Sequence, residues 1–104
     1  MNLKKIAVAG ASGRMGRMLI EAIDADPDSQ LAGALDIAGA PGLGMDAGSS
    51  MGRTLGVTIH ADIARGLADA AFLIDFTRPA GTLAHLDYCA AHGVKMIIGT
   101  TGFD

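Results

Sequence analysis

Three regularly spaced glycines near the start of the chain form a motif that can hold a diphosphate. The segment Gly10-Ala11-Ser12-Gly13-Arg14-Met15-Gly16 has the form GxxGxxG and follows a short apolar run. Backbone N–H groups at a helix start attract phosphate, and the helix dipole adds to that attraction. Glycines at the closest positions let the phosphates approach, because a Cβ would hold them off. The motif therefore predicts a diphosphate site between a strand and a helix.

An acidic residue follows at the spacing that a ribose partner requires. Asp36 ends the next apolar segment, about 20 residues beyond Gly16. A carboxylate there can accept hydrogen bonds from both ribose hydroxyls. Alone, Asp36 more often simply begins a turn, whereas its combination with the glycine motif favours dinucleotide binding. We predict a nicotinamide dinucleotide, because GxxxxGK[ST] is absent and Tyr88 has no lysine four residues on.

Further polar residues follow two later apolar segments. Phe76-Thr77-Arg78 and Gly99-Thr100-Thr101-Gly102 stand where two predicted strands end. Ligands of open α/β sheets collect at the carboxyl ends of the strands. Threonine hydroxyls and free amides there could orient a nicotinamide carboxamide, although Thr and Gly are also ordinary turn formers. Arg14 could equally pair with a phosphate or lie solvated at the surface.

The histidines and the lone cysteine suggest little chemistry. We expect His85 and His92 on a solvated helix face, with His92 also near a helix C-terminus, and His60 has no evident partner. One cysteine cannot form an internal disulfide, and no Cys/His pairs have zinc spacing, so we predict no metal site. The side chains expected to pack in the core are Met15, Met18, Tyr88 and Cys89.

Alternating strands and helices must position these residues. The predicted strands are 6–9, 30–35, 57–60, 72–76 and 95–98, and the predicted helices are 13–25, 62–67 and 79–92. Asp62 caps the second helix in this scheme, and Gly93 ends the third. Residues 38–56 are glycine-rich and too long for an ordinary connection, so we expect a functional or disordered loop. The pattern predicts a doubly wound α/β fold with a mostly parallel sheet.

Composition sets the broad class of protein. The chain has 104 residues, which suits one domain, and its 50% hydrophobic and 18% charged residues exclude intrinsic disorder. A net charge of −3 without a basic run makes nucleic acid an unfavourable partner. The apolar run 6–11 is shorter than a signal peptide requires, so we expect neither secretion nor membrane binding. The single cysteine fits a reducing cytoplasm.

Three segments carry a resemblance to a known family. GASGRMGR at 10–17, DFTRPAGT at 75–82 and IGTTGFD at 98–104 resemble the N-terminal domain of 4-hydroxy-tetrahydrodipicolinate (dihydrodipicolinate) reductases. The segment Gly44-Met45-Asp46-Ala47-Gly48 resembles the same family, and the likeness spans the whole chain. It implies a Rossmann-like fold and hydride transfer from NADH or NADPH to a cyclic imine-type dicarboxylate in lysine and diaminopimelate biosynthesis.

The resemblance also implies roles for particular residues. Asp36 would bind the adenosine ribose, and Phe76 with Thr77 the neighbouring ribose-phosphate side. Ile37 stands where some members carry an arginine for the 2′-phosphate of NADPH, so we expect NADH to be preferred, with NADPH as a second cofactor through Arg14. The residues that would cradle the pyrophosphate are Gly10, Ala11, Ser12, Gly13, Arg14 and Met15, and those beside the nicotinamide are Gly99, Thr100 and Thr101.

The chain is shorter than members of this family. Their second domain carries the histidine-pair and lysine motif that grips the substrate and supplies the proton, so we expect residues 1–104 to be a truncated, N-terminal dinucleotide-binding domain without catalytic residues. We expect cofactor binding without turnover and an exposed apolar face that favours self-association or marginal stability. The family implies a homotetramer held through the second domain, which does not transfer to this chain.

Two other readings of the sequence remain open. The first is the dinucleotide-binding domain of a different NAD(P)-dependent reductase, and the second is a non-catalytic module that senses NAD.

Overall fold

One parallel sheet organises the protein. The computed structural model describes residues 3–75 and 79–98, and within them five strands pair in the order β3-β2-β1-β4-β5. Every pairing between these strands is parallel, which confirms the predicted doubly wound, Rossmann-like fold. The elements in chain order are β1 Lys4–Ala9, α1 Arg14–Ala25, β2 Ser29–Leu35, the 3₁₀ turn η1 Ser49–Met51, β3 Ile59–His60, α2 Ile63–Gly66, β4 Phe72–Asp75, α3 Pro79–His92 and β5 Lys95–Ile98.

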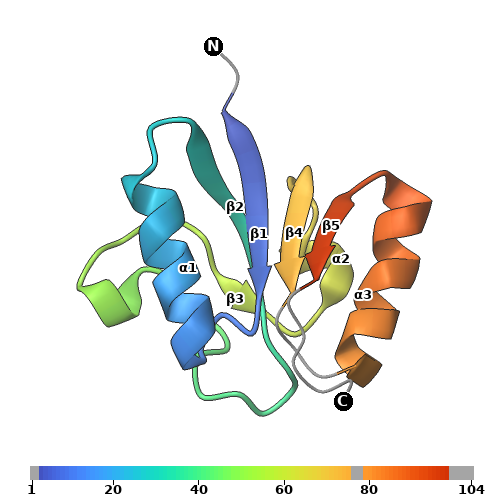
Figure 1. The fold of residues 1–104 in the computed structure, drawn as a ribbon. Coiled ribbons are helices and arrows are strands. Elements are labelled where there is room, and N and C mark those ends of the chain that lie inside the picture. The colour runs from blue at the N-terminus through green and yellow to red at the C-terminus, as the bar shows by residue number, and fades with distance from the viewer. Residues whose placement is uncertain (1–2, 76–78, 99–104) are drawn as a thin grey trace.

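Helices cover both faces of the sheet. Helix α1 lies on one face, whereas α2 and α3 lie on the other (Figure 1). The central strand β1 contributes to the apolar core on each face of the sheet. Val8 belongs to the cluster with Ile20 and Ile23 of α1, whereas Ala7 and Ala9 belong to the cluster with Cys89 of α3. Ala7 and Val8 are completely buried. This two-sided burial explains why β1 has an uninterrupted apolar sequence instead of an alternating one.

Most predicted elements are present, and their ends differ by one or two residues. Strand β1 begins at Lys4, and α1 begins after Gly13, which is its N-cap. Asp62 caps α2 as predicted, since its carboxylate accepts from the backbone N–H of Ala64 at 2.9 Å. Gly93 follows α3 with φ of +71°, the conformation expected of a residue that ends a helix. The prediction that β4 extends to residue 76 lies outside the described residues.

Strand β3 is the one element that is much shorter than predicted. Only Ile59 and His60 pair with β2, whereas residues 57 and 58 turn toward the preceding loop. Ala47 N donates to Val57 O at 2.7 Å, and Thr58 forms an antiparallel bridge with Asp46. The backbone of residues 57 and 58, which was expected to pair with β2, therefore pairs with residues 46 and 47 of the glycine-rich loop.

Two predicted core residues are exposed. Met15 and Met18 are 50% and 64% exposed, so their assignment to the core is wrong. The residues of helix α1 that face the sheet are Gly16, Ile20 and Ile23. Met15 and Met18 lie outside this buried face of the helix and are exposed to solvent. Cys89 is buried at 2% exposure, and Tyr88 packs against the same cluster, which confirms both of those predictions.

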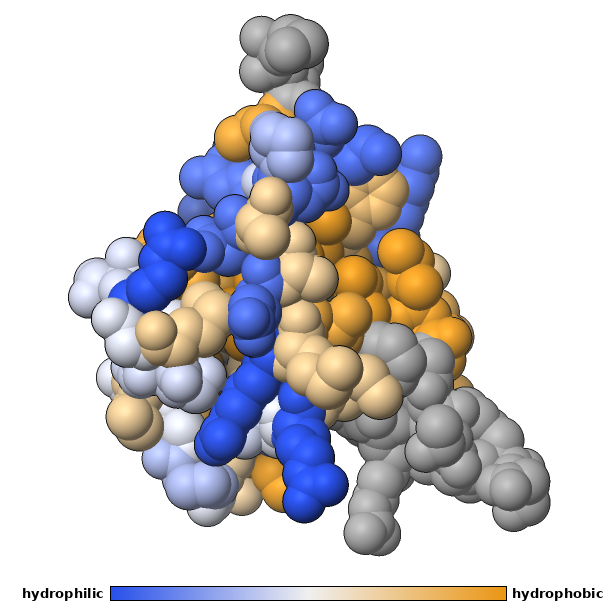
Figure 2. Space-filling view, turned by 60° about the vertical axis from the view of Figure 1, so that its left-hand side comes forward, coloured by the Kyte–Doolittle hydropathy of each residue, from blue (hydrophilic) through white to orange (hydrophobic). Residues whose placement is uncertain are grey.

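Several large apolar side chains reach the surface, as the sequence predicts. Ile97 and Ile98 of β5 are 53% and 46% exposed, and Leu83 and Leu86 of α3 are also exposed. Figure 2 shows hydrophobic atoms gathered on one side of the surface. Self-association through such atoms stays a prediction. Of the helices within the described part of the chain, none has the length and apolarity to cross a membrane.

Gly16 tests the contact that brings α1 onto the sheet. A Cβ at this position would lie 2.1 Å from Gly10 O and 2.8 Å from Ala11 Cα. Alanine normally stabilises a helix by about 1 kcal/mol relative to glycine, whereas overpacking costs about 1 to 3 kcal/mol. The atoms that would be met belong to the backbone and cannot turn aside, so we expect a cost near the top of this range. Gly16→Ala should then lower the free energy of unfolding by up to about 2 kcal/mol net, measured by denaturant titration.

Gly13→Ala is the matched control for this variant. The nearest atom to a Cβ at Gly13 is Gly10 O at 3.4 Å, an ordinary contact. The control should lose less than about 1 kcal/mol, since only the N-cap preference changes. Equal losses in the two variants would contradict the proposed close packing.

Candidate functional site

The glycine turn is held at the end of the central strands by backbone hydrogen bonds. Gly10 N and Ala11 N both donate to Leu35 O, at 2.9 and 3.0 Å, and Gly13 N donates to Gly10 O at 3.0 Å. The N-cap of α1 is Gly13, and among residues 3–75 and 79–98 no side-chain hydrogen bond caps this helix start. Helix N–H groups without a cap are suited to an anion, and the diphosphate site stays a prediction.

Asp36 lies directly beside this turn. It follows β2, whose carboxyl end adjoins that of β1 through the pair Ala9 and Leu35. Ser12 N donates to Asp36 Oδ2 at 2.9 Å, the Ser12 hydroxyl bonds to the same oxygen, and Ile37 N donates to Asp36 Oδ1 at 2.8 Å. The two parts of the predicted motif, separated in the sequence, are thus in hydrogen-bond contact.

A cavity opens where the turn and Asp36 meet. It has a volume of about 380 Å³ and is lined by Gly10, Ser12, Gly13, Asp36 and residues 37–41. Ile37 is 69% exposed there and places no positive charge next to the carboxylate. The first residues of the glycine-rich loop therefore form a wall of the candidate site, a role that its length alone did not specify.

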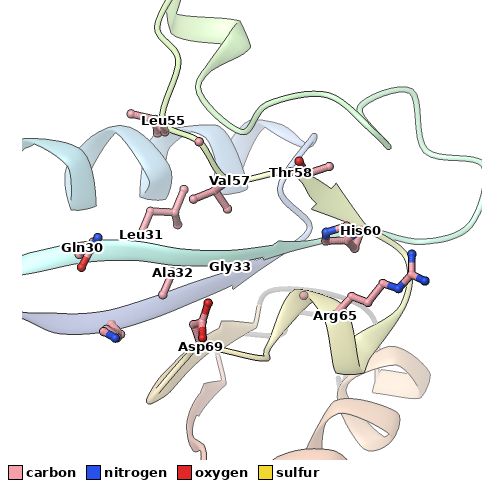
Figure 3. Close-up of a pocket in the computed structure, with 13 residues that line it drawn as sticks. Gln30, Leu31, Ala32, Gly33, Leu55, Val57, Thr58, His60, Arg65 and Asp69 are labelled. Atoms are coloured by element: carbon pink, nitrogen blue, oxygen red, sulfur yellow. The ribbon is translucent and has the colours of Figure 1, made fainter.

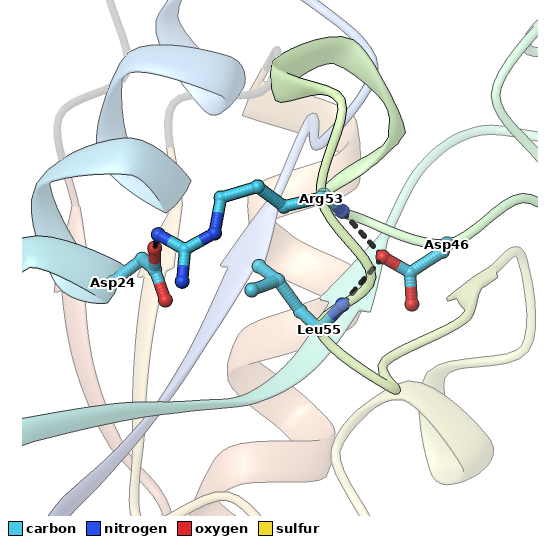
Figure 4. Close-up of polar contacts among 5 residues, drawn as sticks. Asp24, Asp46, Arg53 and Leu55 are labelled. Atoms are coloured by element: carbon cyan, nitrogen blue, oxygen red, sulfur yellow. Dashed lines mark hydrogen bonds and ion pairs between the residues drawn. The ribbon is translucent and has the colours of Figure 1, made fainter.

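The rest of the glycine-rich loop is ordered around one carboxylate. Asp46 Oδ2 accepts from Leu55 N at 2.9 Å (Figure 4) and from Gly48 N at 2.8 Å. Asp46 Oδ1 accepts from Gly56 N and Val57 N. The backbone N–H groups, that of Leu55 foremost, lower the pKa of Asp46 below its ordinary value. An ionised Asp46 therefore satisfies four backbone donors, which explains how a loop with so many glycines keeps one conformation.

An ion pair ties this loop to α1. The Arg53 guanidinium contacts the Asp24 carboxylate across 29 positions of sequence, as Figure 4 shows. The Arg53 side chain is 62% exposed, so the pair contributes little to stability. Its effect is to orient the loop against the helix that begins at the glycine turn.

A larger cavity lies away from these residues. It has a volume of about 490 Å³ and runs along the part of β2 that β3 leaves uncovered, between Leu55 and Val57 on one side and Arg65 and Asp69 on the other (Figure 3). Its lining contains none of the residues predicted to bind a cofactor. Chemistry and not volume therefore identifies the smaller cavity at Asp36 as the candidate site.

The carboxyl ends of β4 and β5 lie at the same edge of the sheet. Asp75, the last residue of β4, pairs with Ala9 of β1 and with Ile98 of β5, so these three strands end at the edge of the sheet where the glycine turn follows β1. The predicted residues Phe76, Thr77, Gly99, Thr100 and Thr101 lie outside the described part of the chain. Arg14 is exposed and forms no ion pair with a described residue, and Met15 is exposed on the same helix.

A buried histidine–carboxylate pair lies at this edge and was not expected. His85 Nδ1 is 2.6 Å from Asp75 Oδ2, with the side chains 12% and 0% exposed, so the placement of His85 on a solvated face is wrong. Sequence offered only a weak signal, an aspartate directly before the Phe-Thr segment and a histidine on the next helix. His92 fits its prediction, because it is exposed in the last turn of α3 and bonds to Tyr88 O.

The pair also affects a neighbouring thiol. Burial raises the pKa of Cys89, and the negative charge of Asp75 raises it further. A thiol with a raised pKa is a poor nucleophile, in agreement with the core role expected for Cys89. The described residues contain no group of three or more side chains suited to a metal ion.

Removal of the His85 ring tests what this pair contributes. His85→Ala would take a hydrogen-bond donor from the fully buried Asp75 carboxylate, and we expect a loss of about 2 to 3 kcal/mol in the free energy of unfolding. His92→Ala, on the exposed part of the same helix, should lose less than about 1 kcal/mol. Denaturant titration compares the two, and similar losses would argue against a stabilising role for the pair.

Comparison with known proteins finds similarity to the N-terminal part of dihydrodipicolinate reductases. The profile of the family described as "Dihydrodipicolinate reductase, N-terminus" matches residues 4–104. The 4-hydroxy-tetrahydrodipicolinate reductase of Herminiimonas arsenicoxydans is 68% identical over 104 residues, and that of Janthinobacterium sp. (strain Marseille) is 65% identical over 104 residues. Each match covers 100% of this chain and 39% of the relative, so the chain spans about two fifths of the relatives' length.

A solved structure supports the fold. The dipicolinate-bound dihydrodipicolinate reductase from Paenisporosarcina sp. TG-14 matches with a TM-score of 0.75 at 21% sequence identity. The match covers 99% of this chain and 39% of that chain.

Proposed function

This chain belongs to the family of dihydrodipicolinate reductase N-terminal domains, and we propose that it binds NADH or NADPH for such a reductase. The observation that carries the proposal is the contact between the glycine turn and Asp36 at one cavity. We further propose residues 1–104 as the dinucleotide-binding domain of a longer enzyme that acts in lysine and diaminopimelate biosynthesis. The family match weighs against a reductase of another dinucleotide-binding family.

Each part of the candidate site has a chemical task in this proposal. The uncapped N–H groups at the start of α1 would bind the pyrophosphate, and the Asp36 carboxylate would accept hydrogen bonds from the adenosine ribose. Arg14, at the first turn of α1, would offset phosphate charge. The bound cofactor supplies a hydride. Phe76 and Thr77 would contact the neighbouring ribose-phosphate side, and Gly99, Thr100 and Thr101 would hold the nicotinamide.

The site favours NADH over NADPH in our proposal. The Asp36 carboxylate would repel a 2′-phosphate, and Ile37 offers that phosphate no positive charge. Arg14, at the start of α1, is the candidate for a compensating cation and the reason to expect use of both cofactors. We therefore propose a preference for NADH and not an exclusive use of it.

The remaining parts of the enzyme would lie in the other domain. We propose that the cyclic imine-type dicarboxylate substrate and the proton donor are held there, that the enzyme works in the cytoplasm, and that its homotetramer forms through that domain. Residues 1–104 would then contain no catalytic residue.

Cofactor binding is the first test. Calorimetric titration of the chain should detect NADH binding, and Asp36→Ala should weaken it about tenfold or more because the ribose loses its charged acceptor. The same variant should weaken NADPH less, since it also removes a repulsive charge. The control Asp69→Ala removes an exposed carboxylate on another part of the surface and should change neither affinity. Absence of NADH binding by the unaltered chain would refute the proposal.

Turnover is the second test. The 104 residues alone should not oxidise NADH when the dicarboxylate substrate is added, because the proposed proton donor is not among them. The assay follows NADH absorbance with and without substrate. Substrate-dependent oxidation by this chain would show that the catalytic residues are present in it.

A further inference from the structure

Asp36 already has protein hydrogen-bond partners in this structure. Its carboxylate accepts from Ser12 N and the Ser12 hydroxyl at Oδ2 and from Ile37 N at Oδ1. An ionised carboxylate offers about four acceptor positions, two on each oxygen. Among the described residues these three donors therefore leave one acceptor position open for a ligand.

A ribose with two free hydroxyl groups needs more than this. Engagement of both hydroxyls requires two acceptor positions on Asp36, one more than is open. Ser12 N and Ile37 N belong to the backbone at the turn and at the end of β2, where neighbouring hydrogen bonds hold the chain. The Ser12 hydroxyl is the only one of the three donors that can leave by rotation about a side-chain bond.

The surroundings of Ser12 allow such a rotation. Ser12 lines the cavity at Asp36 and also a second cavity of about 60 Å³, which Ala11, Arg17 and Gly42 help to line. The loop lies close over the serine, since a Cβ at Gly42 would be 2.6 Å from Ser12 Cβ. The Ser12 side chain therefore lies between the two cavities, and the absence of a Cβ at Gly42 leaves space for it.

We propose that the Ser12 hydroxyl caps Asp36 in the nucleotide-free protein and gives way to the ribose. Ser12 then acts through Asp36, because its hydroxyl competes with the 2′- and 3′-hydroxyls of an adenine nucleotide for the same carboxylate. This inference rests on the proposed function, because it concerns the same ribose site. It gives Ser12 a role different from that of a phosphate-binding side chain.

The two roles predict opposite effects of removing the hydroxyl. If Ser12 competes with the ribose, Ser12→Ala should strengthen binding of a nucleotide with both hydroxyls. A 2′-deoxyribose has one hydroxyl and needs only the open position, so its binding should not change. If Ser12 instead donates to phosphate, Ser12→Ala should weaken ribose and deoxyribose nucleotides alike.

The experiment is a calorimetric titration of the chain with ADP and with 2′-deoxy-ADP. We expect Ser12→Ala to bind ADP about threefold to tenfold more tightly than the unaltered chain, the effect of one net hydrogen bond. The dissociation constant of 2′-deoxy-ADP for Ser12→Ala should stay within about twofold of its value for the unaltered chain, a difference within the spread of such comparisons. Ser12→Gly is a second variant without the hydroxyl, and it should also bind ADP more tightly. It covers the case in which the alanine substitution disturbs the turn.

Ser50→Ala serves as the matched control. Ser50 lines the second cavity, is exposed and forms no hydrogen bond with a described residue, so both nucleotides should bind this variant as they bind the unaltered chain. Weaker or equal binding of ADP by Ser12→Ala and Ser12→Gly would overturn the competition between Ser12 and the ribose, while leaving the proposed function intact. Failure of the unaltered chain to bind either ADP or NADH would overturn both.

Discussion

The Leu35 carbonyl is the acceptor on which the arrangement of the candidate site depends. Two successive N–H groups of the glycine turn donate to it, so the turn is fastened to the end of β2 one residue before Asp36. The glycine turn and Asp36, the two parts of the proposed dinucleotide site, are thereby held at a set separation. The close approach of α1 at Gly16 completes this geometry, because it aims the start of the helix at the same point.

The same region shows how a glycine-rich loop can be well ordered. Asp46 collects four backbone donors, and the bridge from Asp46 to Thr58 draws residues 57 and 58 away from the sheet. The loop gains a fixed shape, while β2 loses part of its cover and a broad cavity opens along it. The contacts of this one carboxylate thus explain both the fixed shape of residues 46–57 and the short β3.

Family membership and site geometry support different parts of the functional argument. The sequence identity of 68% to a curated reductase and the matching family profile establish which proteins this chain resembles, over about two fifths of their length. The contact of Ser12 with Asp36 adds something specific to these residues, since it suggests that the free protein occupies its own ribose acceptor. In the proposed mechanism a nucleotide replaces the Ser12 hydroxyl on the Asp36 carboxylate. Its affinity therefore depends on the difference between these two hydrogen bonds.

Sequence by itself determined the strand–turn–helix motif, the order of the elements, the Asp62 cap and the helix end at Gly93. These features depend on local backbone conformation and on periodic apolar patterns, which neighbouring residues specify. Tertiary structure decided which side of α1 meets the sheet, leaving Met18 exposed, and it paired His85 with Asp75 and Ser12 with Asp36. Each of these outcomes depends on a second element packed against the first, and a pattern within one segment contains no information about that partner.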